Sequence, residues 1–163
     1  EKTLEAVELA RSASDERSEM VALSELARMT ATIGRPAESE AHCDRMLTLA
    51  ERFRERYWLV TARVNRLWLA VLRGEWDVAR TLGDEALALQ PRDARSLASM
   101  ALVAEQLGDR AEADSYAERL LEARSLSTAA FAFEDACAAG YLPQIARIAA
   151  SAQAFALPPA AVV

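Results

Sequence analysis

Residues 95–122 have the sequence RSLASMALVAEQLGDRAEADSYAERLLE, two apolar-periodic segments separated by Leu107-Gly108. In each segment apolar residues return every three or four positions, the spacing that places them along one side of an α-helix. The glycine after the first segment predicts a left-handed helix cap, because glycine adopts that conformation without steric cost. The stretch therefore predicts a helical hairpin.

The same arrangement recurs along the chain. Gly34, Gly74, Gly108 and Gly140 each follow one apolar-periodic segment and precede another, at steps of 40, 34 and 32 residues. A unit of this length, made of two helices, cannot bury its own apolar face and must stack on neighbouring units. Most glycines and prolines lie where helices would stop, and β-branched and aromatic residues are scarce, so we expect an all-α fold.

A chain of 163 residues is long enough for one domain with a sizeable core. We expect a single repeat domain over 1–163, with hairpins over about 18–54, 56–91, 93–125 and 127–157 and a half-repeat or cap over 1–16. The expected helices cover about 3–16, 18–33, 36–54, 56–73, 75–89, 93–107, 110–124, 127–139 and 142–156. Asp93, after Pro91, and Ser127 are the expected N-caps of two of them.

Residues within these units resemble the tetratricopeptide repeat. The matching residues are Leu97, Met100, Ala101, Ala104, Leu107, Gly108, Ala113, Ala117 and Leu120 in the third hairpin; Leu23, Leu26, Ala27, Thr30, Gly34, Cys43 and Met46 in the first; Leu67, Ala70, Gly74, Ala79, Ala86 and Pro91 in the second; and Ala129, Ala132, Phe133, Ala136, Gly140, Ile145, Ala149, Ala152 and Pro158 in the degenerate fourth. The resemblance implies a right-handed α-α superhelix of about four hairpins plus a leading helix. It also implies a non-catalytic module that binds a protein or peptide partner in its concave groove.

The 40-residue step, and residues 34–52 in particular (GRPAESEAHCDRMLTLAER), resemble the tetratricopeptide regions of large bacterial LuxR-type and MalT-like regulators. This resemblance implies a regulatory module of a bacterial signalling or transcription-regulatory protein, with ATPase and output domains elsewhere. The start at Glu1 and the apolar end at Val163 favour a piece of a longer chain.

The family's groove positions, transferred residue by residue, lie on the first helix of each hairpin. They give Arg28 in the first hairpin, with Val21 and Ser24; Val64 and Trp68 in the second; Arg95, Leu102 and Glu105 in the third; and Glu134 in the fourth. This mixture of apolar residues and arginines suits a peptide or helix with an acidic end. The carboxylate clamp of co-chaperone repeats is not supported, because these positions lack its lysines and asparagines.

Arg63 and Arg66 occupy positions at which the other hairpins have core residues. Two arginines there would be costly unless they are paired. Either the helix is rotated, so that Val64, Leu67, Trp68 and Val71 form the buried stripe, or the arginines reach a cleft and meet carboxylates or an anionic ligand. Both alternatives stay open from the sequence.

The sequence offers little for catalysis or metal binding. His42 is the only histidine, and the two cysteines, Cys43 and Cys137, have no metal-ligand spacing and suggest buried thiols in a reducing, cytoplasmic compartment. Carboxylates such as those of residues 16, 19, 25, 38 and 40 have helical spacings that suit solvated faces and arginine pairs. We therefore expect no enzyme, no cofactor and no metal site.

The net charge and the hydropathy of the chain limit the kinds of partner that we expect. A net charge of -6 disfavours direct binding to nucleic acid or to an anionic membrane surface. No apolar run reaches the ~20 residues that span a bilayer. Two alternatives to protein binding in the groove remain: a small-molecule sensor with its ligand near Arg63, Arg66 and Trp68, and a homo-oligomerisation unit, such as a homodimer, that packs through residues 146–163.

Overall fold

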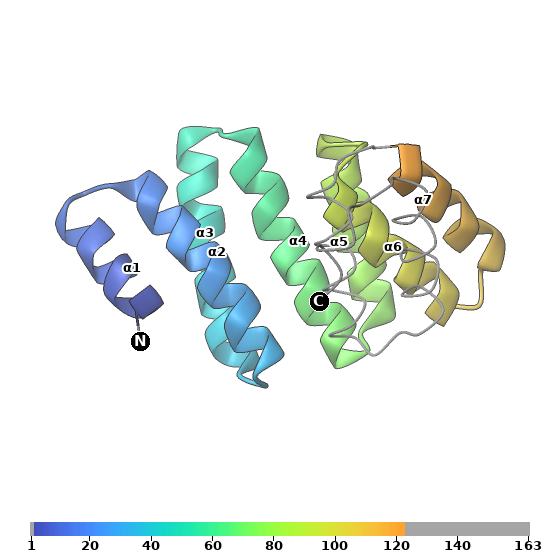
Figure 1. The fold of residues 1–163 in the computed structure, drawn as a ribbon, viewed down its shortest axis with the longest axis horizontal. Helices are drawn as coiled ribbons and strands as arrows, with labels where there is room; N and C mark the ends of the chain where they lie inside the picture. The colour runs from blue at the N-terminus through green and yellow to red at the C-terminus, as the bar shows by residue number, and fades with distance from the viewer. Residues whose placement is uncertain (1, 123–163) are drawn as a thin grey trace, which may run out of the picture. The chain divides into compact units, whose positions relative to one another are not determined.

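The computed structural model describes residues 2–122, and all regular secondary structure in this range is helical (Figure 1). The helices are α1 (Lys2–Ser12), α2 (Glu16–Thr32), α3 (Pro36–Phe53), α4 (Arg56–Arg73), α5 (Trp76–Leu89), α6 (Ala94–Gln106) and α7 (Arg110–Glu122). They match seven of the nine expected helices. The other two, over 127–139 and 142–156, and with them the fourth hairpin, lie outside the described residues.

The chain divides into two compact units, Glu1–Pro91 and Arg92–Val163. The division falls where the second hairpin was expected to end. The single domain over 1–163 stays a prediction.

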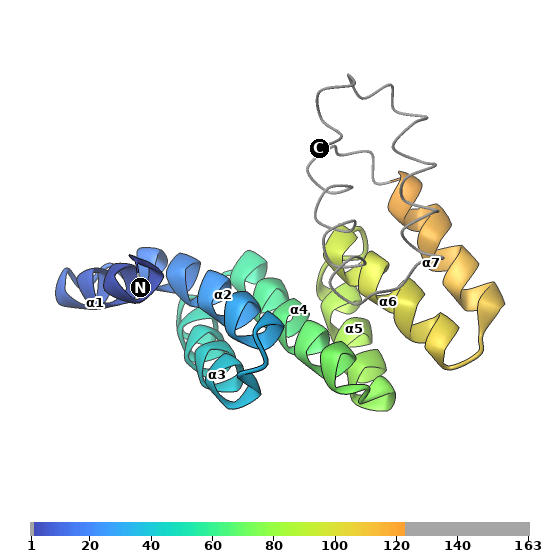
Figure 2. The ribbon, with the colours of Figure 1, turned by 60° about the horizontal axis from the view of Figure 1, so that its bottom comes forward.

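The first unit contains α1 to α5, and its helices pack as stacked hairpins. α2 packs against α3, and α4 packs against α5, so each hairpin is closed on itself. α1 also contacts α2, α3 contacts α4, and α2 contacts α4, so each helix meets the next along the chain and the first helices of both hairpins meet each other. Figure 2 shows α2 and α4 following one another along one side of this unit, with α3 beneath α2.

The core of this unit uses the residues that the repeat pattern predicts. A cluster at its centre includes Met20, Leu23, Met46 and Leu49, all fully buried. Ala27, one of the small residues that match the repeat, is buried, and its carbonyl accepts a hydrogen bond of 2.8 Å from the buried hydroxyl of Ser39 on α3. Small side chains at this crossing bring α2 and α3 close enough for that bond.

One backbone motif ends helices α1 to α4 and α6. A residue with positive φ follows the helix, its amide donates to the carbonyl three residues earlier, and the next amide donates to the carbonyl five residues before it, which is the Schellman arrangement. The residue is Gly34, Gly74 or Gly108 within the hairpins, as expected, but Ser14 or Arg54 between them. The sequence predicts helix breaks near both points, but not the left-handed conformation of Ser14 and Arg54, because neither turn contains a glycine.

The first helix is shorter than expected. It ends at Ser12, where the prediction extended it to residue 16. Ser14 adopts φ 54°, and the carboxylate of Asp15 accepts hydrogen bonds from the amide and the hydroxyl of Ser18, at 3.1 and 2.6 Å. Asp15 therefore caps α2 and fixes the end of α1.

Within the second unit, the structure describes one hairpin, in which α6 packs against α7. The expected cap is confirmed: a carboxylate oxygen of Asp93 accepts from the amide and the hydroxyl of Ser96 at 2.9 and 2.8 Å. Leu97, Met100 and Ala113, all predicted core residues, are buried. Ser127, the other expected cap, lies outside the described residues.

Candidate partner-binding surface

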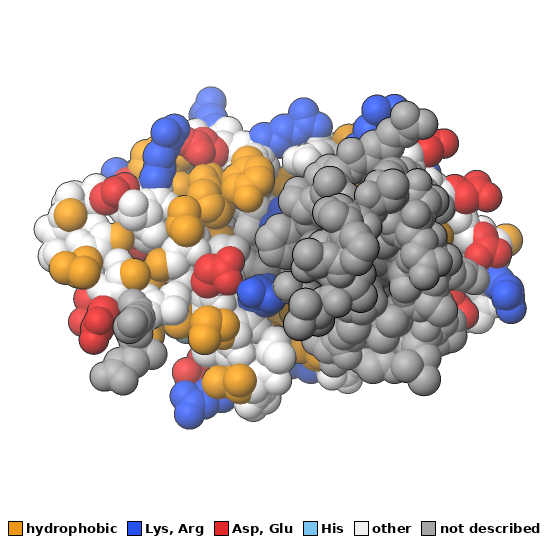
Figure 3. Space-filling model, viewed as in Figure 1, with side chains coloured by type: hydrophobic (Ala, Val, Ile, Leu, Met, Phe, Trp, Pro, Cys, Tyr) orange, Lys and Arg blue, Asp and Glu red, His pale blue; other side chains and the backbone are white. Residues whose placement is uncertain are grey.

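The outer face of α2 is open and partly apolar. Val21 is 52% exposed and Met29, two helical turns later, is 48% exposed, although the opposite side of α2 is packed into the core. The half-buried Arg28 lies between them on the same face and pairs with Glu25 at 3.3 Å. Figure 3 shows apolar side chains gathered over α2 and the start of α4. Of these residues, sequence reasoning proposed Val21 and Arg28 and missed Met29, which lies off the apolar stripe of the helix.

Val64 and Trp68, the groove residues expected on α4, are buried. Leu67 and Val71 are buried as well, so the four side chains form the buried stripe that one reading of Arg63 and Arg66 required. Because these side chains expose so little surface, contact of Val64 or Trp68 with a partner stays a prediction.

Arg63 and Arg66 lie at the sides of this stripe and pair with carboxylates of neighbouring helices. The Nε atom of Arg63 lies 3.1 Å from a carboxylate oxygen of Glu85 on α5, and the guanidinium of Arg66 pairs with Asp44 on α3. The buried stripe of the first alternative is present, and both arginines pair with carboxylates at the surface of the unit. The cleft of the second alternative stays a prediction. Contact of either arginine with an anionic ligand or a partner stays a prediction.

The remaining groove candidates belong to the second unit. On α6, Arg95 and Glu105 are half-buried and Leu102 is buried. Arg95 lies 3.4 Å from the capping carboxylate of Asp93. Glu134 lies outside the described residues. A role for these side chains in partner binding stays a prediction.

A polar contact that sequence reasoning missed joins α2 to α4. The amide of Asn65, on α4, donates to the backbone carbonyl and the hydroxyl of Ser24, on α2, both at 3.3 Å. Ser24 was an expected groove residue. Its hydroxyl therefore helps to hold the two helices together beside the open face of α2.

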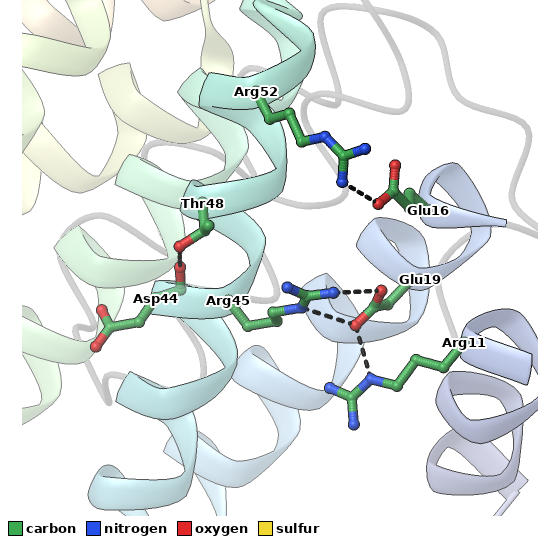
Figure 4. A network of polar contacts seen from close by, with 7 residues as sticks. All are labelled: Arg11, Glu16, Glu19, Asp44, Arg45, Thr48 and Arg52. Atoms are coloured by element: carbon green, nitrogen blue, oxygen red, sulfur yellow. Dashed lines mark hydrogen bonds and ion pairs between the residues drawn. The ribbon is translucent and has the colours of Figure 1, made fainter. Parts of the chain in front are cut away.

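Arginine–carboxylate pairs also link successive helices of the first unit. Glu19 is the centre of one network (Figure 4), in which its carboxylate binds Arg11 of α1 at 2.8 Å and Arg45 of α3 through two bonds of 3.0 and 3.1 Å. Arg52 of α3 binds Glu16 of α2 at 2.6 Å, and Arg73 of α4 binds Glu40 of α3 at 2.6 Å. Pairs at helical spacing, as expected, form at Glu25 with Arg28 and at Glu38 with Arg35, whereas the pairs of Glu16, Glu19 and Glu40 join different helices. The expectation of a solvated Glu19 is wrong, since only 1% of it is exposed.

Burial and hydrogen bonding act in opposite directions on Glu19. Burial raises the pKa of its carboxyl group, but hydrogen bonds from Arg45 and Arg11 outweigh burial and hold the pKa below its usual value. Glu19 is therefore ionised at neutral pH and neutralised by two cations, which makes it a structural carboxylate.

Burial shifts the pKa values of Cys43 and His42, the cysteine and the histidine among the described residues. Burial raises the pKa of the Cys43 thiol to about 12, so the thiol stays protonated at neutral pH, as a small buried hydrophobe does. Burial lowers the pKa of His42, which Glu38 opposes and Arg11 reinforces. Cys137 lies outside the described residues.

Two further searches cover the described part of the chain. Within residues 2–122, no three histidine, cysteine or carboxylate side chains are grouped so that they could hold a metal ion. None of the helices in this range is long and apolar enough to cross a membrane. The absence of a metal, a cofactor and an enzymatic activity stays a prediction.

The comparisons with known proteins show the fold. No protein-family model and no curated protein matches the sequence. The structure is similar to the crystal structure of PilW, a widely conserved type IV pilus biogenesis factor, with a TM-score of 0.53 and 18% identity over 93% of this chain and 76% of that chain. This likeness supports a tetratricopeptide-like helical repeat and confirms the all-α repeat fold class. The resemblance to LuxR-type and MalT-like regulators stays a prediction.

Proposed function

We propose that the chain is a non-catalytic protein-interaction module that binds a peptide or a partner domain along the open face of α2. One observation supports this above all: Val21 and Met29 are each about half exposed on a helix whose other side is packed. A contiguous exposed apolar patch is typical of a surface that another protein covers, and these two side chains belong to the apolar surface over α2 and the start of α4 (Figure 3).

The spacing on α2 indicates the form of the partner. Val21 and Met29 are eight residues apart, so their side chains lie about 12 Å from each other along the helix. A helix or extended peptide with two apolar side chains at that distance would cover both. Arg28, beside Met29, suits an acidic residue in the same partner segment.

The fold fits the proposed binding of a protein partner. Tetratricopeptide-like repeats present long surfaces to other proteins, and PilW, with a similar fold, is a biogenesis factor for type IV pili. We further propose that the module belongs to a larger bacterial signalling or transcription-regulatory protein in the cytoplasm. The small-molecule alternative has less support, because Arg63 and Arg66, near which its ligand was expected to bind, pair with Glu85 and Asp44.

The test is capture of partners by the intact chain and by matched surface variants. Val21→Asp and Met29→Asp place a charge on the open face of α2 without entering the core. Val78→Asp is the control, since Val78 lies on α5 and is 51% exposed, almost the same as Val21. The proposal expects the two α2 variants to lose a partner that the Val78 variant retains, with affinity at least about tenfold weaker. Equal capture by all three variants would refute it.

A further inference from the structure

The turn between α3 and α4 concentrates exposed arginine and aromatic side chains. Residues 52–58 have the sequence RFRERYW. Phe53, Arg54, Arg56 and Tyr57 are all exposed, and Arg17, at the start of α2, lies against this turn through an ion pair with Glu55. We call Arg17, Phe53, Arg54, Arg56 and Tyr57 the α3–α4 edge. Figure 3 shows basic side chains bordering the apolar side chains at the upper ends of α2 and α4.

Both aromatic rings of the edge contact a neighbouring side chain. The ring of Tyr57 meets the ring of Trp58 edge-on at 4.9 Å, and Trp58 packs against the buried core cluster of the unit. The guanidinium of Arg52 lies 5.5 Å from the centre of the Phe53 ring and is itself held by Glu16. Rings that are already positioned lose little conformational freedom when a partner covers them.

The arginines of the edge divide into two groups. Arg17 and the neighbouring Arg52 are held by Glu55 and Glu16. Arg54 and Arg56 make no side-chain hydrogen bond or ion pair with any of residues 2–122. The edge therefore presents two uncompensated guanidinium groups on a chain whose net charge is -6.

Arg54 also occupies a backbone position that favours glycine. Its φ is 54°, and the equivalent positions of the turns inside the two hairpins of this unit hold Gly34 and Gly74. A residue with a β-carbon is less stable than glycine in this conformation. An exposed arginine at this position thus destabilises the turn, and its side chain makes no hydrogen bond or ion pair with residues 2–122 that would offset the cost.

We propose that the α3–α4 edge binds an acidic segment of a partner protein, in which carboxylates lie next to an aromatic or aliphatic side chain. The carboxylates would pair with Arg54 and Arg56, and the apolar side chain would cover Tyr57 or Phe53. This inference builds on the proposed function, because Arg17 lies one helical turn before Val21 and the edge continues the open face of α2.

The charges of the edge favour a short acidic segment over a long polyanion. Binding to duplex DNA gains its strength from many phosphate contacts, whereas only two arginines of the edge lack a carboxylate partner among residues 2–122. The carboxylates of Glu51, directly before this stretch, and of Glu55, within it, would repel a continuous row of phosphates. A peptide places its few carboxylates only where the arginines are.

The experiment is selection of random twelve-residue peptides displayed on phage against the intact chain, followed by fluorescence-polarisation titration of the enriched peptides. We expect enriched peptides with aspartate or glutamate beside an apolar residue, and weaker binding as sodium chloride is raised. The pair Arg54→Glu and Arg56→Glu should weaken binding by about tenfold or more. The control pair, Arg92→Glu and Arg110→Glu, makes the same charge change elsewhere and should leave the affinity within about twofold.

Arg54→Gly separates a binding role from a structural one. The variant relieves the left-handed conformation, so it should raise the midpoint of urea unfolding, and it removes one guanidinium, so it should weaken peptide binding about threefold. A turn with no role in binding would show the gain in stability and unchanged affinity.

The opposite results are equally specific. The inference is overturned if selection enriches no peptide, if the enriched peptides lack acidic residues, or if charge reversal at Arg54 and Arg56 leaves their affinity unchanged. It is also overturned if single-stranded DNA or phosphatidylserine vesicles bind these two arginines more tightly than the peptides do. Peptides that depend on Val21 and Met29 but not on the edge would leave the proposed function standing without this inference.

Discussion

Replacement of Glu19 by glutamine tests the network that joins the first three helices. The carboxylate makes three charge-assisted hydrogen bonds, one to Arg11 and two to Arg45. Glutamine has nearly the same shape and keeps one acceptor oxygen, but its NH₂ group would face a guanidinium NH of Arg45 as a second donor. The change therefore removes one bond, weakens two and leaves the packing almost unaltered.

The size of the effect depends on the exposure of the arginines. Breaking a fully buried ion pair costs about 3–5 kcal/mol, because the remaining charge stays out of water. The side chains of Arg11 and Arg45 are 52% and 43% exposed, so both guanidinium groups can recover hydration. We therefore expect Glu19→Gln to lower the free energy of unfolding by about 2 kcal/mol.

Urea unfolding followed by circular dichroism measures this change. A loss of 2 kcal/mol corresponds to a shift of the unfolding midpoint by about 1 M urea for a slope typical of small proteins. Glu25→Gln is the control: Glu25 forms an exposed ion pair with Arg28 on the same helix, and its loss should cost less than about 0.5 kcal/mol. Equal midpoints for Glu19→Gln and the unmodified chain, or equal losses in both variants, would refute the reasoning.

The dependence on pH gives a second check on the same network. The pKa of Glu19 is lowered in the folded chain, so its contribution to stability is fully present above its ordinary pKa of 4.5 and disappears as the pH falls through the lower folded value. The difference in stability between the unmodified chain and Glu19→Gln should therefore shrink as the pH is lowered below 4.5. A difference that stays constant down to pH 2 would contradict an ionised Glu19.

Gly34→Ala should cost about 1 kcal/mol because Gly34 has a φ of 77°; outside the adjacent residues, no heavy atom lies within 4 Å of the added carbon. Arg54→Gly should stabilise the chain by a similar amount, so the urea midpoints of the two variants should move in opposite directions. Asp93→Ala should lower stability by about 1 kcal/mol through loss of the N-cap, a change that thermal unfolding would detect. With Cys137 changed to serine, Cys43 should react with a thiol reagent at pH 8 only after urea is added, because its pKa is about 12; rapid labelling of the folded chain would contradict this.

Most of the fold could be predicted from the sequence because the helices have local signals. Gly34, Gly74 and Gly108 mark the turns within hairpins, and Pro91 with Asp93 marks the start of α6. Apolar residues at helical spacing identify the core. These signals act between residues that are close in sequence, so they need no knowledge of which helix packs against which.

The features that sequence reasoning missed depend on residues that are distant in sequence, or on residues in a backbone conformation that their type disfavours. The burial of Glu19 follows from Arg11 and Arg45 on two other helices, and its own spacing suggests a solvated position. The turns at Ser14 and Arg54 adopt a conformation that their residue types disfavour.

The candidate site was predicted only in part. The open positions at Val21 and Arg28 follow from the repeat pattern. The burial of Val64 and Trp68 and the pairing of Arg63 depend on how helix surfaces meet, which one sequence does not specify.

The turns at Ser14 and Arg54 share one backbone geometry and lie 40 residues apart, so the segment 15–54 between them is an interchangeable cassette. Deletion of the cassette would join Ser14 to Glu55, and duplication would join Arg54 to a second Asp15, in each case across a junction that the chain already uses. An array built in this way can gain or lose a whole hairpin without a new loop conformation at the junction.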